Sequence, residues 1–258
     1  MLDFGIEIYS VLILCGVAFA AGFIDAVAGG GGLLTVPALL TVGLPPHLAL
    51  GTNKLAASFG SFIASLTYFK KKLFNPVFWR DSIIATAVGS VIGTVIVTYL
   101  SGDFLEKWLP VLIAITAVYT LVSKPKPDSQ LTLPAVTTKF KVIRAIQGFV
   151  LGFYDGFAGP GAGAFWTVST MAIYKMNLLL SCGLARTMNF VSNFSSLIAF
   201  MVLGHINYML GICMGLCLMV GAYIGAHSAI KFGSRFIRPV FITVVLGIAA
   251  QLTYKAWF

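Results

Sequence analysis

The sequence predicts an all-α polytopic membrane protein with two inverted repeats of about five helical elements each and a glycine-broken short helix in each repeat. Three observations support this fold class: the composition, an internal duplication and the distribution of basic residues. Hydrophobic residues make up 59% of the 258 residues and charged residues only 10%, whereas an average soluble domain carries about 25% charged residues. Such a composition excludes soluble enzymes, secreted disulfide scaffolds and disordered tails.

Ten apolar segments follow one another, and most approach the roughly 20 residues that a membrane-spanning helix needs. Residues 33–45 and 163–175 are too short to cross comfortably, and each follows a glycine-rich break. We expect the first segment to be a retained span, because Asp3 and Glu7 stand where a signal peptide would carry positive charge. The ten segments cover residues 6–28, 33–45, 48–69, 81–101, 106–122, 142–158, 163–175, 179–203, 208–230 and 236–255.

The two breaks belong to an internal duplication. GFIDAVAGGGG at residues 22–32 and GFYDGFAGPGA at residues 152–162 agree at six of eleven positions. A shared preference for apolar residues does not keep Gly, Asp, Asn and Pro in one order, so we infer two repeats, residues 1–122 and 142–258, joined by a linker at 123–141. Further matches are Thr52-Asn53-Lys54 with Thr187-Met188-Asn189, Asn75 with Asn207, Pro110 with Pro239, and the glycine pair Gly89 and Gly93 with Gly221 and Gly225, whose spacing is typical of helix-contact faces.

Basic residues gather on one side of the predicted topology. Thirteen of the 17 lie between the third and fourth segments, in and beside the linker, at the end of the seventh segment, and between the ninth and tenth. By the positive-inside rule these regions are cytoplasmic, which makes 123–141 a cytoplasmic linker, places both termini outside and inverts the second repeat relative to the first. The net charge of +9 therefore marks topology in a lipid bilayer, and we expect no nucleic-acid partner.

Short, glycine-interrupted segments at matching positions of two inverted repeats indicate a transport site. Broken backbone at membrane depth leaves polar groups without partners, so it persists only beside protein or a water-filled cavity. Helices that start after the breaks would direct their N-terminal N–H groups at such a cavity and favour an anion. The alternative is that the glycines only permit close helix packing.

Ionisable residues within the spans are costly in lipid and are therefore candidates for function. Lys54 and Arg186 both lie near the start of the third element of their own repeat, and inversion would bring their motifs together. Two cations with neighbouring hydrogen-bond donors suit a small oxyanion. The alternative is that Lys54 pairs with Asp25, and Arg186 with Asp155. The predicted substrate-binding residues are Gly30, Gly31, Thr52, Asn53, Lys54, Ser58, Gly161, Arg186, Thr187, Asn189 and Asn193.

Asp25 and Asp155 lie beside the breaks, where a carboxylate could carry a coupling proton or cation, cap a half-helix or neutralise a cation. We expect capping or pairing ahead of coupling. The four cysteines lie in apolar stretches without metal-ligand spacing, so we expect buried structural thiols, and we expect the three histidines to be structural. No zinc-protease, serine-hydrolase or Walker motif occurs, and we expect no enzyme activity, no catalytic residue, no cofactor and no metal.

Three stretches resemble the repeat signatures of the sulfite exporter TauE/SafE family. AGFIDAVAGGGGLLTVPALLTVGLPPHLALGTNKLAASFGS (residues 21–61) resembles the first signature, and GFYDGFAGPGAGAFW (152–166) with ARTMNFVSN (185–193) resembles the second. The likeness covers nearly the whole chain, with Pro160 and Ala162 in place of glycines of the first repeat. It implies a permease for small anions, such as sulfite or organosulfonates, in the bacterial cytoplasmic (inner) membrane.

Three functions remain open at the level of the sequence. The first is a secondary transporter that moves a small sulfur-containing oxyanion by alternating access. The second is an anion channel with the same lining, and the third is a non-transporting membrane sensor or scaffold. The first two predict that substitution of Lys54 or Arg186 changes anion flux, and a homodimer suits a permease of this size.

Overall fold

The chain is helical with connecting turns, and no strand occurs in the described part, which confirms the predicted all-α class. Two predicted segments, 106–122 and 236–255, lie mostly outside that part. The computed structural model describes residues 7–109, 111, 115, 137–233, 235–237 and 239. The helices are α1 (Ile8–Val27), α2 (Gly32–Thr41), α3 (Pro46–Lys70), α4 (Arg80–Thr98), α6 (Thr138–Phe157), α7 (Ala162–Tyr174), α8 (Leu178–Leu203) and α9 (Tyr208–Phe232).

Seven of these helices, all except α6, fall into three groups by length and polarity. α1, α4 and α9 are long and apolar enough to cross a membrane. α3 and α8 are longer, at 25 and 26 residues, but they carry many buried polar side chains. α2 and α7 have 10 and 13 residues, fewer than the roughly 20 that a span requires. The prediction of two short helices after the glycine breaks is confirmed.

Local sequence sets the helix ends that differ from the predicted ones. α2 ends at Thr41, before the predicted limit at residue 45, because Gly43 turns the chain with a φ of 88°. α6 begins at Thr138, inside the predicted linker, because the side-chain hydroxyl of Thr137 accepts a hydrogen bond from the N–H of Phe140 and caps the helix.

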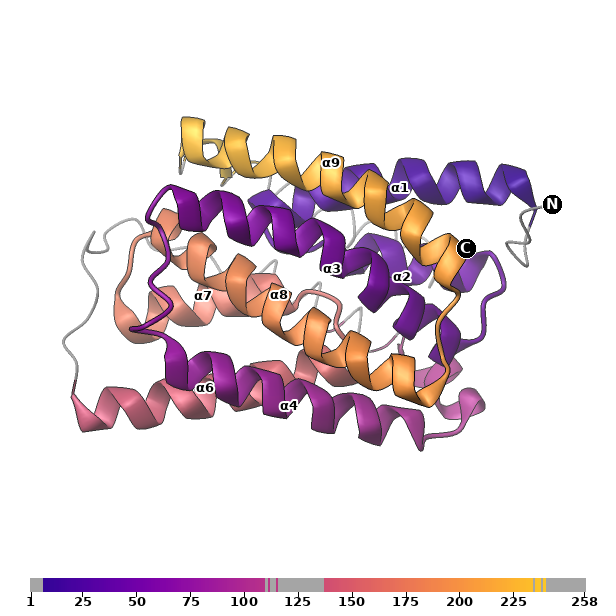
Figure 1. The fold of residues 1–258 in the computed structure, drawn as a ribbon, viewed down its shortest axis with the longest axis horizontal. Helices are drawn as coiled ribbons and strands as arrows, with labels where there is room; N and C mark the ends of the chain where they lie inside the picture. The colour runs from indigo at the N-terminus through magenta and orange to yellow at the C-terminus, as the bar shows by residue number, and fades with distance from the viewer. Residues whose placement is uncertain are drawn as a thin grey trace.

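The helices are arranged in layers (Figure 1). α1 and α9 pack together along one flank, α4 and α6 pack together along the other, and α3 and α8 lie in contact between the flanks. The short helix α2 packs on α1 and α3, and the short helix α7 packs on α6 and α8. Each flank therefore combines one helix from the first half of the chain with one from the second.

Glycines bring the two helices of each flank into backbone contact. A Cβ added at Gly22 of α1 would overlap the carbonyl of Leu218 in α9, and one added at Gly89 of α4 would overlap the carbonyl of Phe149 in α6. We call these two interfaces the glycine seams. The predicted helix-contact faces are thereby confirmed. Comparable overlaps recur at Gly93, Gly148, Gly152, Gly156, Gly221 and Gly225.

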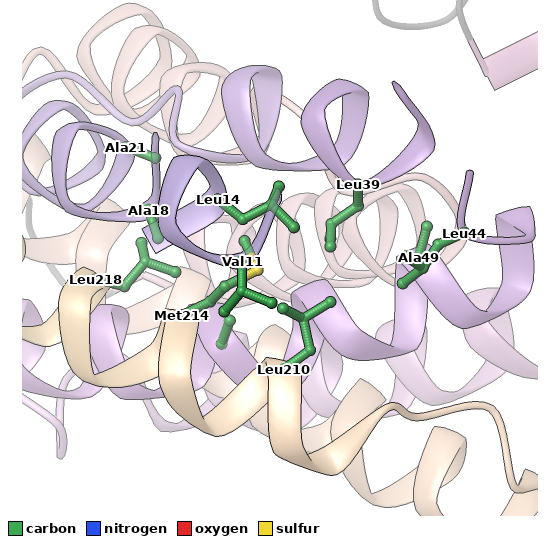
Figure 2. Packing of buried hydrophobic residues seen from close by; sticks show 11 residues of the cluster. Val11, Leu14, Ala18, Ala21, Leu39, Leu44, Ala49, Leu210, Met214 and Leu218 are labelled. Atoms are coloured by element: carbon green, nitrogen blue, oxygen red, sulfur yellow. The ribbon is translucent and has the colours of Figure 1, made fainter. Parts of the chain in front are cut away.

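An apolar cluster attaches α2 to the first flank (Figure 2). Val11 and Leu14 of α1 lie against Leu210 and Met214 of α9, with Leu39 of α2 in the same cluster, and all five side chains are buried. Lipid is as apolar as these side chains, so in a bilayer the close packing itself stabilises the contact. The cluster holds the half-helix α2 beside the first break.

Candidate functional site

Both glycine breaks lie inside the molecule and contact each other. Gly29 in the first break has a φ of 86°, and Gly159 and Gly161 in the second have φ values of 89° and 79°. Glycine reaches these left-handed conformations without a steric cost. The N–H of Ala164, in the first turn of α7, donates to the carbonyl of Gly29 at 2.9 Å. The start of α7 therefore rests on the break that precedes α2.

A small cavity lies between the two breaks, α3 and α8. Its volume is about 30 Å³, which is room for about two waters, because one water needs roughly 10–15 Å³ of this volume. Several predicted site residues line it, as do both aspartates, which supports the expectation that the breaks face a polar cavity. These lining residues are Gly31, Asn53, Gly161, Asn189 and Asn193, with Asp25 and Asp155.

Lys54 of α3 reaches across to the second break. Its Nζ atom donates to Oδ1 of Asp155 at 2.6 Å, to the backbone carbonyl of Asp155 at 2.5 Å and to Oδ1 of Asn193 at 3.1 Å. The Lys54 and Asp155 side chains are each 2% exposed. A buried ammonium needs such partners, because charged groups away from water are costly unless they are paired and hydrogen-bonded.

Arg186 of α8 connects the two breaks and is fully buried. Its Nη1 donates to the backbone carbonyl of Asp25, beside the first break. Its Nη2 donates to the hydroxyl of Thr167 at 3.2 Å and to the carbonyl of Gly163 at 3.4 Å, both in α7. The carboxylate of Asp25 is farther away, with 3.9 Å between Nη1 and Oδ1. The Nε atom has no hydrogen-bond partner among the described residues.

The charge pairs connect opposite halves of the chain. Lys54 pairs with Asp155, and Arg186 faces Asp25. The pairing of each cation with the aspartate of its own half, which the sequence left open, is therefore wrong. Because α3 and α8 pack against each other in the centre, each helix reaches the break of the other half.

The two carboxylates have different surroundings. Asp25 accepts a hydrogen bond from the N–H of Gly31, the residue that precedes α2, and another from Nδ2 of Asn189, both at 3.1 Å. Its side chain is 17% exposed. Asp155 accepts from Lys54 and from the hydroxyl of Ser192. Asp25 therefore caps a half-helix and Asp155 forms a buried ion pair, the two structural roles expected of these aspartates.

Six predicted site residues do not line the cavity: Lys54 and Arg186, which stand behind it, and four others. Thr52 accepts a hydrogen bond from the N–H of Asn207 at 3.0 Å, toward the α8–α9 turn. Ser58 donates to the carbonyl of Lys54 at 2.7 Å. Thr187 accepts from Ser65 at 3.0 Å, which joins α3 to α8. The fourth residue is Gly30, whose backbone carbonyl accepts a hydrogen bond from the N–H of Leu33 at 3.0 Å and so supports the first turn of α2.

Sequence reasoning missed three polar residues of the site. Thr35 lines the cavity and donates to Oδ1 of Asn53 at 2.5 Å. Ser192 donates to Asp155, and Thr167 accepts from Arg186. A signal for Ser192 was its place within ARTMNFVSN. Thr35 and Thr167 each lie on the first turns of a half-helix, where a polar residue stands out in an apolar segment.

Other candidate residues lie away from the cavity. His47 and His205 stack with ring centroids 5.3 Å apart where α3 begins and α8 ends. Burial, together with the neighbouring His47 ring, lowers the pKa of His205 from its ordinary value of 6.5. All four cysteines are free thiols, with Cys182 buried and the others half-buried. No group of three or more His, Cys, Asp or Glu residues in the described part could hold a metal ion.

Curated bacterial proteins match almost the whole chain. It is 36% identical, over its full length and 99% of the relative, to a Haemophilus influenzae protein named "Probable membrane transporter protein". It is 34% identical over 93% of its length to "Probable membrane transporter protein YfcA" of Escherichia coli, covering 88% of that protein. "Probable membrane transporter protein ORF9" of Sinorhizobium sp. is 34% identical over 91% of the chain and 89% of the relative. No solved structure matches.

A family model also covers the features that form the site. The model described as sulfite exporter TauE/SafE matches residues 14–252, which include both glycine breaks, Lys54 and Arg186. The relatives are named as probable membrane transporters, and the described helices include three that are long and apolar enough to cross a membrane. This chain is a membrane protein that belongs to the sulfite exporter TauE/SafE family.

Proposed function

We propose that the protein is a secondary transporter of a small sulfur-containing oxyanion, such as sulfite or an organosulfonate, and that it works by alternating access. The observation that carries this proposal is the meeting of both glycine breaks at one polar cavity, with two buried cations behind it. Helix N-termini and amide donors bind oxyanions, and intramembrane charges mark substrate pathways. The family description, sulfite exporter, supports the choice of sulfur oxyanions.

The proposal includes two inverted repeats, and a reciprocal exchange of contacts supports them. Phe19 meets Gly221 in the α1–α9 seam, and Phe149 meets Gly89 in the α4–α6 seam. Phe149 corresponds to Phe19 in the duplicated sequence, and Gly221 corresponds to Gly89. Repeats related by a pseudo-twofold axis exchange equivalent contacts in this way, and transporters bind their substrates at the interface between such repeats.

The proposed location is the cytoplasmic (inner) membrane of a bacterium, with both termini outside and the linker at 123–141 inside. The basic residues at 70–72, at the end of α3, support this orientation together with Lys231 at the end of α9. The named relatives come from bacteria. A homodimer and a coupling proton or cation belong to the same proposal, and neither a nucleic acid nor a cofactor does.

Flux measurements on the purified chain in proteoliposomes test the proposal. The panel contains sulfite, sulfate, thiosulfate, methanesulfonate, sulfoacetate, taurine and simple carboxylates. We expect saturable uptake of at least one sulfur oxyanion and counterflow, which is the signature of a carrier. Failure of every panel anion to bind or move would contradict the substrate class. Flux without saturation or counterflow would indicate an anion channel, and binding without flux a sensor.

Two asparagine variants connect that flux to the cavity. Asn53→Ala removes a lining amide that also accepts from Thr35, and we expect uptake to fall by about tenfold, which corresponds to the loss of one hydrogen bond of about 1.4 kcal/mol. Asn75→Ala, in the exposed α3–α4 turn, is the matched control and should leave uptake unchanged. Equal uptake by both variants would remove Asn53 from the substrate site.

A further inference from the structure

The ionisable groups at the cavity balance one another before any substrate is present. Asp25 and Asp155 line it, and Lys54 and Arg186 stand directly behind them. Two carboxylates and two cations sum to zero charge. An anion that entered this set would leave one negative charge without compensation inside a membrane protein, which is a costly arrangement. Binding of an anion therefore calls for the neutralisation of one carboxylate.

Asp155 is poorly suited to take up a proton. Its Oδ1 lies 2.6 Å from the ammonium of Lys54, its other oxygen accepts from Ser192, and the side chain is 2% exposed. Protonation would break a buried ion pair and leave Lys54 uncompensated, and removal of one partner from such a pair is strongly destabilising. The Lys54–Asp155 pair is a fixed part of the site.

Asp25 differs from Asp155 on each of these counts. Two neutral groups hold its carboxylate, the N–H of Gly31 and the amide of Asn189. The guanidinium of Arg186 is 3.9 Å away and donates instead to the backbone carbonyl of Asp25. The side chain is 17% exposed and lines the cavity. A proton can reach this carboxylate and neutralise it without breaking a direct ion pair.

The donors that hold Asp25 are also those that would bind an oxyanion. An N–H group at the start of α2, a side-chain amide and a nearby guanidinium form an ordinary oxyanion site, and in this structure the carboxylate of Asp25 occupies it. The fully buried Arg186 also has an Nε–H without a partner among the described residues. Asp25 thus takes the place of a substrate anion.

We propose that Asp25 is the proton-binding residue of the transporter and that its carboxylate competes with the substrate for the same donors. Protonation releases the N–H of Gly31 and the amide of Asn189, and the substrate anion then accepts from both. One proton from water ends on Asp25 for each bound anion, so proton and negative charge enter the site together. This inference rests on the proposed function and identifies its coupling ion.

Other titratable groups around Asp25 already have partners. On α3, the hydroxyl of Tyr68 donates to the carbonyl of Ala26 at 3.2 Å. On α8, the thiol of Cys182 contacts the carbonyl of Val27 at 3.8 Å. Lys54, Asp155 and Arg186 are the remaining charged groups that face the cavity in the described part of the chain. Of the two carboxylates, Asp25 is the one whose cation does not donate to it, because Nη1 of Arg186 lies 3.9 Å from its Oδ1.

Binding titrations of the purified full chain across about pH 5.5 to 8 test the inference, with methanesulfonate as the probe because its single negative charge stays constant over this range. For the wild type we expect affinity to fall by about tenfold per pH unit above the pKa of Asp25, which is the linkage of one proton to one anion. Asp25→Asn should bind the anion with an affinity independent of pH, and Asp25→Glu should restore the pH dependence.

The control is Asp81→Asn, the same chemical change at a half-exposed carboxylate that faces Arg144 outside the cavity, and it should keep the wild-type pH dependence. If Asp25→Asn does not fold, proton uptake by the wild type on adding methanesulfonate in weak buffer gives the same answer. Anion binding with an unchanged slope in Asp25→Asn, or binding without proton uptake, overturns the inference and leaves the proposed transport standing. The absence of binding of any panel anion overturns both.

Discussion

At the scale of single residues, the hydrogen-bond acceptors of the Lys54 ammonium in the described part of the chain all belong to the second half. Two are atoms of Asp155 and one is the side chain of Asn193. With both charges 2% exposed, neither partner can turn to water if the other is removed. The pair therefore fixes α3 to the second break as well as placing charge beside the cavity.

We expect Lys54→Met to lower the free energy of unfolding by about 3–5 kcal/mol, because it leaves the carboxylate of Asp155 buried and uncompensated. Lys71→Met, at the exposed end of α3, is the control and should change it by less than about 0.5 kcal/mol. The double variant Lys54→Met/Asp155→Leu should recover much of the loss. Denaturant unfolding in detergent measures all three, and equal stability of the two single variants would contradict the ion-pair assignment.

The sequence identified the residues of the site better than it identified their partners. Lys54, Arg186, Asp25 and Asp155 stand out because an ionisable side chain within a span is costly. Their pairing between halves depends on the packing of α3 against α8, which neither periodicity nor the duplication specifies. The partners of Thr35 and the other polar neighbours depend on the same packing.

At the scale of elements, the first break depends on two separate properties of Gly29. Its φ of 86° favours glycine, and a Cβ there would lie 2.5 Å from the carbonyl carbon of Gly163 and 2.6 Å from the guanidinium of Arg186. Gly43 shares the conformation, with a φ of 88°, but has nothing within 4 Å of an added Cβ. The position of Gly43 therefore favours glycine only because of its backbone conformation, whereas the position of Gly29 also has no room for a side chain.

We expect Gly43→Ala to cost only the left-handed strain, about 1–2 kcal/mol, with anion uptake retained. Gly29→Ala should cost about 1–3 kcal/mol more, because it also forces α7 and Arg186 away from the break, and it should abolish uptake. Unfolding and proteoliposome flux, measured on the same preparations, report both effects. Loss of uptake in Gly43→Ala, or normal uptake in Gly29→Ala, would contradict this view of the break.

Helix existence and order were predictable because the apolar segments are long and the glycine breaks are explicit in the sequence. The start of α6 and the end of α2 were not predictable. The start of α6 depends on a cap by Thr137, and the end of α2 depends on the left-handed turn at Gly43. These are interactions of one or two residues, which a pattern averaged over a whole segment does not resolve.

At the scale of the whole molecule, the proposed inverted topology with both termini outside predicts which turns face each side of the membrane. In a variant with serine at the four cysteine positions, Thr41→Cys and Tyr208→Cys should react with a membrane-impermeant maleimide in intact cells. Asn75→Cys and Lys231→Cys should react only after permeabilisation. All four positions are exposed in the structure. Outside labelling at Asn75→Cys or Lys231→Cys would contradict the proposed orientation.

The duplication indicated which helices correspond but not which helices touch. α1 corresponds to α6 and α4 corresponds to α9 in the sequence, yet α1 packs on α9 and α4 packs on α6. The duplicated sequence shows which residues of the two halves are equivalent. Which helices pack together also depends on the position of the axis that relates the halves. The glycine pairs Gly89 with Gly93 and Gly221 with Gly225 indicated that close contacts exist, without identifying their partners.

The α1–α9 seam has a consequence for how the protein is made. α1 is the first described helix to leave the ribosome, and α9, its partner at Gly22 and Gly221, is the last of the helices named above to emerge. Until then the glycine face of α1 meets lipid, which cannot match the backbone contact of the finished flank. Each helix of a glycine seam has its partner in the other half of the chain. The first flank therefore closes only when translation has passed residue 232.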